Sequence, residues 1–219
     1  MVELTFVRHG QANTGAQDEA SYDQLSDTGR EQAQWLGQHF ITAGRGFDHV
    51  ISGTLKRQQD TARIVADQLG LRVHQDARLN EMDYFGLSHS LLESHAVDFP
   101  TDRESFIAHV PQILEVWSRG QIHSHLESFD AFETRISAMI DHADNLGGRV
   151  LMVTSGGVIG MAMKILMQLE LSALSKVLLQ VYNSSIHRYV KAGDQLVLDT
   201  FNAVPHLERP ERAEKRTHI

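Results

Sequence analysis

The sequence feature that most restricts the fold is an unbroken apolar run late in the chain, Val150-Leu151-Met152-Val153-Thr154. A run without alternating polar side chains is typical of a strand that is buried on both faces of a parallel sheet. A helix pattern that is apolar nearly all round follows it over residues 157–169, and such a helix should be buried too. The chain is therefore expected to contain a central sheet covered by helices.

Strand and helix patterns alternate along most of the 219 residues. Strands are expected over residues 2–7, 48–52, 71–74, 150–154, 186–190 and 195–201, and helices over residues 29–42, 55–69, 103–119, 130–146 and 157–169. Asp27 or Thr28 is expected to cap the first helix, and Pro111 to kink or split the third. Residues 11–26 and 76–102 are expected to be loops. The alternation predicts an α/β fold, a three-layer sandwich with a mostly parallel sheet and helices on both faces.

Length and composition restrict the class of protein further. The length predicts one domain, residues 1–205, followed by a charged tail, residues 206–219. The last dozen residues are expected to be frayed, and Glu208 to Arg216 to be solvated. The 28 acidic and 20 basic residues give a net charge of −8, which argues against a nucleic-acid or membrane partner. The absence of cysteine excludes disulfides and thiolate metal sites and favours a cytoplasmic location. The first residues resemble no signal peptide, and no apolar run is long enough to span a membrane.

Three polar segments follow expected strands, at the ends where parallel sheets bind ligands. They are Arg8-His9-Gly10, Ser52-Gly53-Thr54-Leu55-Lys56-Arg57 and Thr154-Ser155-Gly156-Gly157. An arginine can clamp a phosphate with two parallel hydrogen bonds, and an imidazole can act as a nucleophile. A glycine allows the backbone to turn tightly beside a ligand. The fold is expected to bring these segments together around an anionic ligand.

The order of these segments resembles the histidine phosphatase superfamily, which has the phosphoglycerate-mutase-like fold. The resemblance spans about residues 2–190, and its first motif is Val7-Arg8-His9-Gly10. Four further segments carry it: residues 52–62, Leu79-Asn80-Glu81, Glu127-Ser128-Phe129 followed by Arg135, and residues 153–159. It implies a phosphatase that is independent of metals and of other cofactors, and a small-molecule phosphate ester or a phosphoprotein as substrate.

The resemblance assigns a role to each matching residue. His9 aligns with the nucleophile that forms a phosphohistidine, and Arg8 and Arg57 align with the arginines that clamp the phosphate. Glu81 aligns with the general acid that protonates the leaving oxygen. Asn13 matches a side chain that hydrogen-bonds the phosphate.

The chain departs from the family pattern at one position. Ser155 stands where most members have a second histidine that binds the phosphoryl group. A serine hydroxyl can donate a hydrogen bond but carries no charge, whereas the amide of Gly156 begins a helix and can contact an anion. Ser155 and Gly156 are therefore expected to contact phosphate, and the activity is expected to be weakened.

Two other functions are compatible with these residues. A cofactor-dependent phosphoglycerate mutase would need an adjacent arginine pair after Glu81, but residues 85–127 hold only the isolated Arg103 and Arg119. A non-catalytic phosphate-binding protein would explain Ser155 but not the retained residues of the motifs. His123 and His125 are expected to be solvated rather than metal ligands, and His187 to be a buried histidine with satisfied hydrogen bonds.

Overall fold

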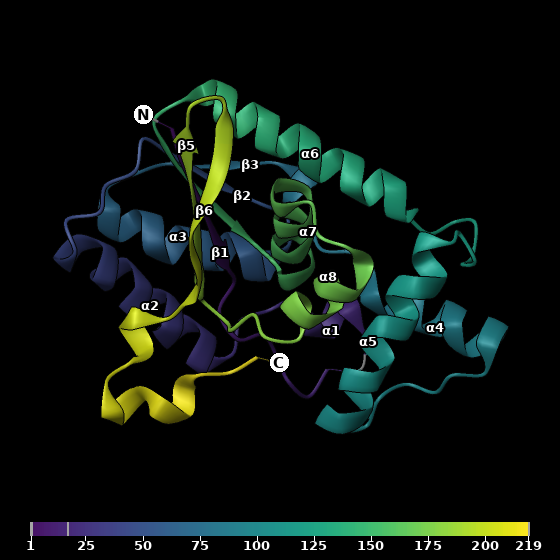
Figure 1. Ribbon diagram of the computed structural model, residues 1–219. Coiled ribbons are helices and arrows are strands. Elements are labelled where there is room, and N and C mark those ends of the chain that lie inside the picture. The colour runs from purple at the N-terminus through teal and green to yellow at the C-terminus, as the bar shows by residue number, and fades with distance from the viewer. Residues whose placement is uncertain (1, 17, 219) are drawn as a thin grey trace.

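The computed structural model describes residues 2–16 and 18–218, and within them a single sheet has six strands in the order β3-β2-β4-β1-β5-β6 (Figure 1). The strands are β1 (Glu3–Arg8), β2 (His49–Ser52), β3 (Val73–Gln75), β4 (Arg149–Thr154), β5 (Ile186–Ala192) and β6 (Gln195–Ala203). The first four strands in this order run parallel, while β5 is antiparallel to β1 and β6 to β5. The mostly parallel sheet that the sequence predicts is therefore confirmed.

Helices connect these strands. They are α1 (Glu19–Tyr22), α2 (Asp27–Thr42), α3 (Lys56–Leu69), α4 (Tyr84–His95), α5 (Arg103–Ser118), α6 (Phe129–Leu146), α7 (Gly156–Met167) and α8 (Leu171–Leu178). Short 3₁₀ helices cover Ala77–Leu79, Pro205–Leu207 and Pro210–Lys215. No helix in the described part of the chain is long and apolar enough to cross a bilayer.

Side chains that alternate along the strands enter two separate apolar cores. Phe6 and Met152 pack in the core that contains residues of α6 and α7, whereas Val7 and Val153 pack in the core that contains residues of α2 and α3. Helices therefore cover both faces of the sheet, and the predicted three-layer sandwich is confirmed.

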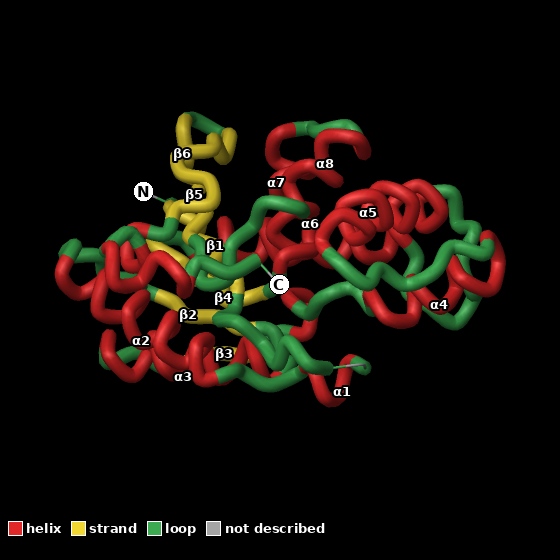
Figure 2. The backbone as a smooth tube through the Cα atoms, turned by 90° about the horizontal axis from the view of Figure 1, so that it is seen from below, coloured by secondary structure: helices red, strands yellow, loops and turns green. Residues whose placement is uncertain are grey.

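Helices α4 and α5 extend beyond the layered part of the molecule (Figure 2). The ring of Trp117 on α5 is 1% exposed, and its centroid lies 5.2 Å from those of Phe129 and Phe132 on α6. This aromatic contact joins α5 to α6, a helix in one outer layer of the sandwich.

Several local predictions need correction. Residues 84–95, expected within a loop, form α4, since the Asp83 carboxylate accepts a hydrogen bond from the Gly86 amide at 2.8 Å and caps the helix. Ser26 caps α2 instead of Asp27 or Thr28, with its hydroxyl accepting from the Gly29 amide. Helix α5 continues through Pro111 and is not split.

The expected fraying of the tail is wrong for the described residues up to 218, whereas most of residues 208–216 are exposed to solvent as predicted. The Thr217 carbonyl accepts a hydrogen bond from the Asn183 amide at 2.8 Å, and the Thr217 hydroxyl donates to the Asn183 side-chain oxygen at the same distance. The fully buried Gln32 side chain donates to the Lys215 carbonyl at 2.7 Å and to the Thr217 hydroxyl at 3.1 Å. These bonds tie the end of the chain to α2 and to the segment before β5.

Replacing Thr217 with alanine is expected to reduce the free energy of unfolding by about 1–3 kcal/mol, because the buried side-chain oxygen of Asn183 loses its hydrogen-bond donor. Urea denaturation measures this change. The matched control is Thr42→Ala on the surface of α2, where the hydroxyl donates only to carbonyls of its own helix, and a change within about 0.5 kcal/mol is expected there. Equal small effects in both variants would show that the tail is not tied down.

Candidate active site

Strand register places the three predicted segments at one edge of the sheet. Arg8 at the end of β1 lies opposite Thr154 at the end of β4, and Ser52 at the end of β2 lies opposite Val153. The His9 amide donates a hydrogen bond to the Thr154 carbonyl at 2.8 Å. Residues that are far apart in sequence thus meet where parallel sheets bind ligands, as the sequence predicts.

Two glycines allow β1 to turn directly after His9. A Cβ atom on Gly10 would lie 2.3 Å from the Gly29 carbonyl oxygen, so the backbones of the turn and of α2 touch. The Gly10 amide donates to the Thr61 hydroxyl on α3 at 3.1 Å. The turn is thereby held between α2 and α3, which fixes the position of His9.

The tautomer of His9 follows from its hydrogen bond. Its Nδ1 atom lies 2.7 Å from the Gly10 carbonyl oxygen, which can only accept. Nδ1 therefore carries the proton, and in the neutral ring Nε2 keeps its lone pair. This is the form in which an imidazole acts as a nucleophile.

Electrostatics keep that ring neutral. The side chain is 2% exposed, and burial, followed by the charges of Arg57 and Arg8, holds the pKa of His9 well below its usual value of 6.5. Both causes act in the same direction, because each disfavours a second positive charge on the imidazole. His9 is thus neutral over the physiological pH range.

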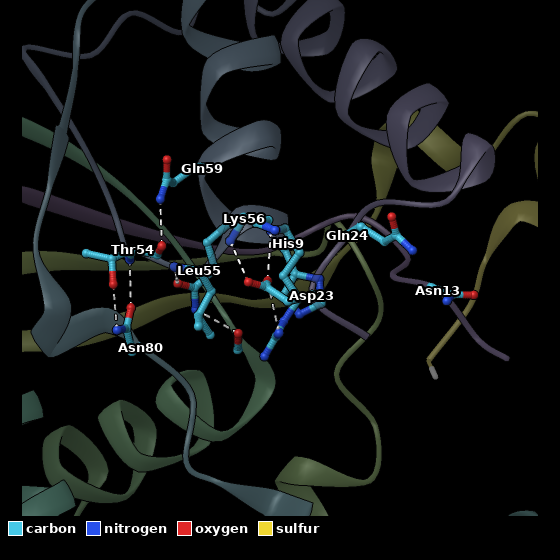
Figure 3. Close-up of polar contacts among 12 residues, drawn as sticks. His9, Asn13, Asp23, Gln24, Thr54, Leu55, Lys56, Gln59 and Asn80 are labelled. Atoms are coloured by element: carbon cyan, nitrogen blue, oxygen red, sulfur yellow. Dashed lines mark hydrogen bonds and ion pairs between the residues drawn. The ribbon is translucent and has the colours of Figure 1, made fainter. Parts of the chain in front are cut away.

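Arg57 is held at the N-terminus of α3 by a carboxylate from the loop between α1 and α2. Asp23 Oδ1 lies 3.2 Å from Arg57 Nη1 and also accepts from the Arg57 amide at 3.1 Å, while Oδ2 accepts from the Lys56 amide at 2.9 Å (Figure 3). The guanidinium lies over the Tyr22 ring, 4.9 Å from its centroid, and the side chain is 1% exposed. Sequence reasoning did not identify Asp23 or Tyr22, because their pairing with Arg57 joins two separate segments.

Arg8 is oriented by backbone carbonyls near the end of the chain. Its Nη1 atom donates to the Val181 carbonyl at 2.6 Å and to the His218 carbonyl. The His218 ring in turn stacks on Tyr182, with centroids 4.1 Å apart. The ordered tail therefore contacts one of the two predicted phosphate-clamping arginines directly.

Glu81 is bonded to the first turn of α7. Its Oε2 atom accepts a hydrogen bond from the Gly157 amide at 3.0 Å, and its Oε1 atom accepts from the Met82 amide at 3.0 Å. A Cβ atom on Gly157 would lie 2.1 Å from Glu81 Oε1. Only glycine at that position leaves room for the carboxylate where it lies.

The Ser155 hydroxyl contacts a buried side chain, and Ser155 is not among the residues that line the pocket. The residue is fully buried, and its hydroxyl accepts a hydrogen bond from the Gln58 side-chain amide at 2.8 Å. The Gln58 amide also donates to the Leu79 carbonyl at 3.0 Å. Of the predicted phosphate ligands, Ser155 is the one that the structure does not place on the pocket wall.

Asn13 lies on the pocket wall, but its amide already has partners within the loop. Its nitrogen donates to the Ser21 carbonyl at 3.0 Å, and its oxygen accepts from the Gly15 amide at 3.3 Å. Thr54 and Asn80, which are not among the cavity residues, are joined to each other by two hydrogen bonds of 2.7 Å each (Figure 3).

One cavity of about 250 Å³ collects these groups. Its lining combines the polar groups of the three segments with apolar side chains of the helices beside them. The predicted site residues on its wall are Arg8, His9, Asn13, Arg57, Glu81 and Gly156. The arrangement combines two cations, one neutral nucleophile and one carboxyl group, which suits transfer of an anionic group through an enzyme-bound intermediate.

His187 and His123 lie outside this cavity, whereas His218 is on its wall. His187 is buried, its Nε2 atom is 2.8 Å from the Ser185 hydroxyl, and burial lowers its pKa to about 3. His123 lies 3.2 Å from Glu93 Oε2, and no cluster of three or more potential metal ligands occurs among the described residues.

The fold and the site together define a class: an α/β protein with a neutral histidine and two arginines at the carboxyl ends of parallel strands. A model of the histidine phosphatase superfamily (branch 1) matches residues 4–204, and the chain belongs to this superfamily. The resemblance seen in the sequence is thereby confirmed at the level of the family.

The proteins to which this chain is similar carry different activities in their names. The curated "Probable phosphoglycerate mutase GpmB" of Enterobacter sp. (strain 638) is 30% identical, over 96% of this chain and 97% of that protein. The structure of a phosphoglycerate mutase from Bacillus anthracis str. Sterne has a TM-score of 0.68 and 25% identity, covering 94% of each chain. The alpha-ribazole phosphatase of Shigella flexneri has a TM-score of 0.67 and 24% identity, covering 92% of this chain and 96% of its own, and shows a similar fold.

Lowering the pH from about 7.5 to about 5.5 is expected to reduce the free energy of unfolding by about 3 kcal/mol through His187 and His206. Burial lowers the pKa of each to about 3 in the folded protein and acts on His9 in the same direction, so only the unfolded chain takes up protons at these positions. The contribution of the neutral histidines to the free energy of unfolding is complete above pH 6.5 and is lost as the pH falls toward about 3. Urea unfolding at several pH values measures it, and equal stability at both pH values would contradict the buried neutral state.

Proposed function

We propose that this protein is a phosphomonoesterase that forms a phosphohistidine on His9. The observation that carries the proposal is the fixed tautomer of His9, which leaves the lone pair on Nε2. His9 lines the same cavity as Arg8 and Arg57. The proposed substrate is a small-molecule phosphate ester or a phosphoprotein. A cytoplasmic location remains a prediction from the cysteine-free sequence.

In the first step, His9 Nε2 attacks phosphorus and forms an N–P bond while the bond to the leaving oxygen breaks. A protonated Glu81 carboxyl gives its proton to that oxygen, so the alcohol leaves neutral. Arg8 and Arg57 neutralise the phosphoryl oxygens as negative charge builds up on them. The hydrogen bond from Nδ1 to the Gly10 carbonyl keeps Nε2 in position throughout.

In the second step, water attacks the phosphohistidine. The Glu81 carboxylate now accepts a proton from the water, the N–P bond breaks, and inorganic phosphate and neutral His9 are released. The two guanidinium groups supply the positive charge that both steps need. We therefore propose that the reaction proceeds without a metal ion or another cofactor.

A phosphoglycerate mutase is the second candidate, because relatives such as the Enterobacter protein carry that name. A mutase would need cations that hold the substrate carboxylate. Arg103 lies on the cavity wall, but Arg119 is not among the cavity residues and pairs with Glu115 on the surface at 2.7 Å. The two arginines that the sequence offers are thus separated, which favours a phosphatase.

A non-catalytic phosphate-binding protein is the third candidate, motivated by Ser155. The missing second histidine is expected to lower the rate by a factor on the order of 10²–10³, as loss of one donor to a developing anion does elsewhere. We propose a weakened enzyme, because His9, Glu81, Arg8 and Arg57 all remain on the cavity wall.

The wild-type protein is expected to hydrolyse p-nitrophenyl phosphate in excess chelator, and His9→Ala to show no activity above background, because the nucleophile is lost. Intact-mass measurement after mixing with substrate should show a phosphate adduct only when His9 is present. Phosphate release and 2- and 3-phosphoglycerate interconversion, followed in parallel by ³¹P NMR, separate phosphatase from mutase. Phosphate binding without hydrolysis or an adduct would favour the non-catalytic protein and contradict the proposal.

Gly157→Ala is expected to lower turnover of p-nitrophenyl phosphate by a factor on the order of a hundred, because the added Cβ atom displaces the Glu81 carboxylate. The neighbouring variant Gly156→Ala is the comparison, since its Cβ atom would meet Arg8 Nε at 3.7 Å, an ordinary contact. Steady-state kinetics with thermal unfolding of both variants measure the effect. A similar loss of activity in both would show that the carboxylate position is not the cause.

A further inference from the structure

The cavity has an apolar wall that the proposed phosphate chemistry does not use. Beside the guanidinium groups of Arg8 and Arg57, much of its lining consists of apolar side chains from helices outside the sheet. The apolar residues on this wall are Met82, Phe85, Phe106, Ile107, Val110, Ile113, Leu114, Leu178 and Leu179. We call this set the apolar wall.

Helix α5 supplies most of the apolar wall at helical spacing. Phe106, Val110 and Ile113 follow one another on one face of this helix, with Ile107 and Leu114 beside them. Ile107 is 43% exposed and lines the cavity, so its side chain is open to a ligand there. An exposed apolar side chain that lines a cavity beside charged groups is suited to contact a ligand.

Two polar side chains near this wall, Tyr84 and Asn13, have partners within the protein, while Arg103 at the start of α5 also lines the cavity. The Tyr84 hydroxyl lies 3.1 Å from His109 Nδ1, and burial raises the pKa of Tyr84 to about 12. The amide of Asn13 is bonded to Ser21 and Gly15. A leaving group rich in hydroxyls would lose hydrogen bonds to water at the apolar wall without regaining them there, which is unfavourable.

We infer that the leaving group of the substrate is apolar and compact, such as an alkyl chain or a single aromatic ring, and that it packs against the apolar wall. The inference rests on the proposed function, because the phosphate end must lie at Arg8, His9 and Arg57. A cavity of about 250 Å³ lies just below the usual range of small-molecule sites, so a small ester suits it.

The test uses ethyl, n-butyl and n-hexyl phosphate, together with glycerol 1-phosphate. The three alkyl alcohols are leaving groups of nearly equal basicity, so differences in kcat/KM measure contact with the protein instead of bond strength. Each methylene that is buried should raise kcat/KM about fourfold, the equivalent of about 0.8 kcal/mol. Hexyl phosphate should therefore exceed ethyl phosphate by a factor on the order of a hundred, and glycerol 1-phosphate should be slower than butyl phosphate.

A matched pair of variants locates the contact. Ile107→Ser should lower the ratio of kcat/KM for hexyl phosphate to that for ethyl phosphate several-fold. Ile41→Ser is the control, because Ile41 on α2 is 46% exposed and lies outside the cavity, so this variant should keep the wild-type ratio. Both side chains are already partly in water, so both variants should fold, and circular dichroism checks this.

The outcomes separate this inference from the proposed function. His9-dependent hydrolysis with equal or falling kcat/KM along the alkyl series would overturn the apolar leaving group and leave the phosphatase intact. An equal fall of the hexyl-to-ethyl ratio of kcat/KM in Ile107→Ser and in Ile41→Ser would also overturn it. If no ester is hydrolysed, the proposed function fails, and calorimetry with ethyl- and n-hexylphosphonate then tests the inference by itself. Tighter binding of the hexyl compound, abolished by Ile107→Ser, supports contact with the apolar wall. Equal binding of the two phosphonates overturns it.

Discussion

The parallel pairing of β1 with β4 is the constraint on which the rest of the structure depends. In this register Arg8 lies opposite Thr154, and the side chains before them alternate between the two cores. A slip of one residue would exchange Phe6 and Val7 between those cores and would move His9 away from the ends of β2 and β4. The buried faces of the sheet therefore fix the register, and the register fixes the position of the candidate nucleophile.

Charge is distributed in the site so that the imidazole stays neutral beside two buried cations. Arg57 is balanced by the Asp23 carboxylate, and Arg8 donates to backbone carbonyls of the late segments of the chain. Burying a guanidinium without such partners would be strongly unfavourable. The same contacts orient both groups toward one cavity, where a phosphoryl group would complete the charge balance. Positioning and stability of the two arginines thus have a common origin.

The cavity is built from two parts of the molecule with different origins. Strand ends and the helices that begin after them supply Arg8, His9, Arg57 and the glycines, while α4, α5 and α8 lie at the apolar part. The first part holds groups suited to phosphoryl chemistry, and the second is suited to contact whatever the phosphate is attached to. A fold that holds the reacting groups at strand ends can thus keep them while the surrounding helices change.

The sequence by itself determined the elements whose signals are local. The apolar run of β4 specifies a buried strand, and Gly70, which adopts a left-handed conformation, ends α3 where the sequence predicts. Tertiary structure decided that Thr217 and Gln32 tie down the tail and that the Ser155 hydroxyl faces Gln58. These contacts join residues far apart in sequence, and nothing in the local pattern of either partner specifies the other. Periodicity and capping depend on neighbours within a few residues, whereas the partners of a buried polar group depend on how the whole chain packs.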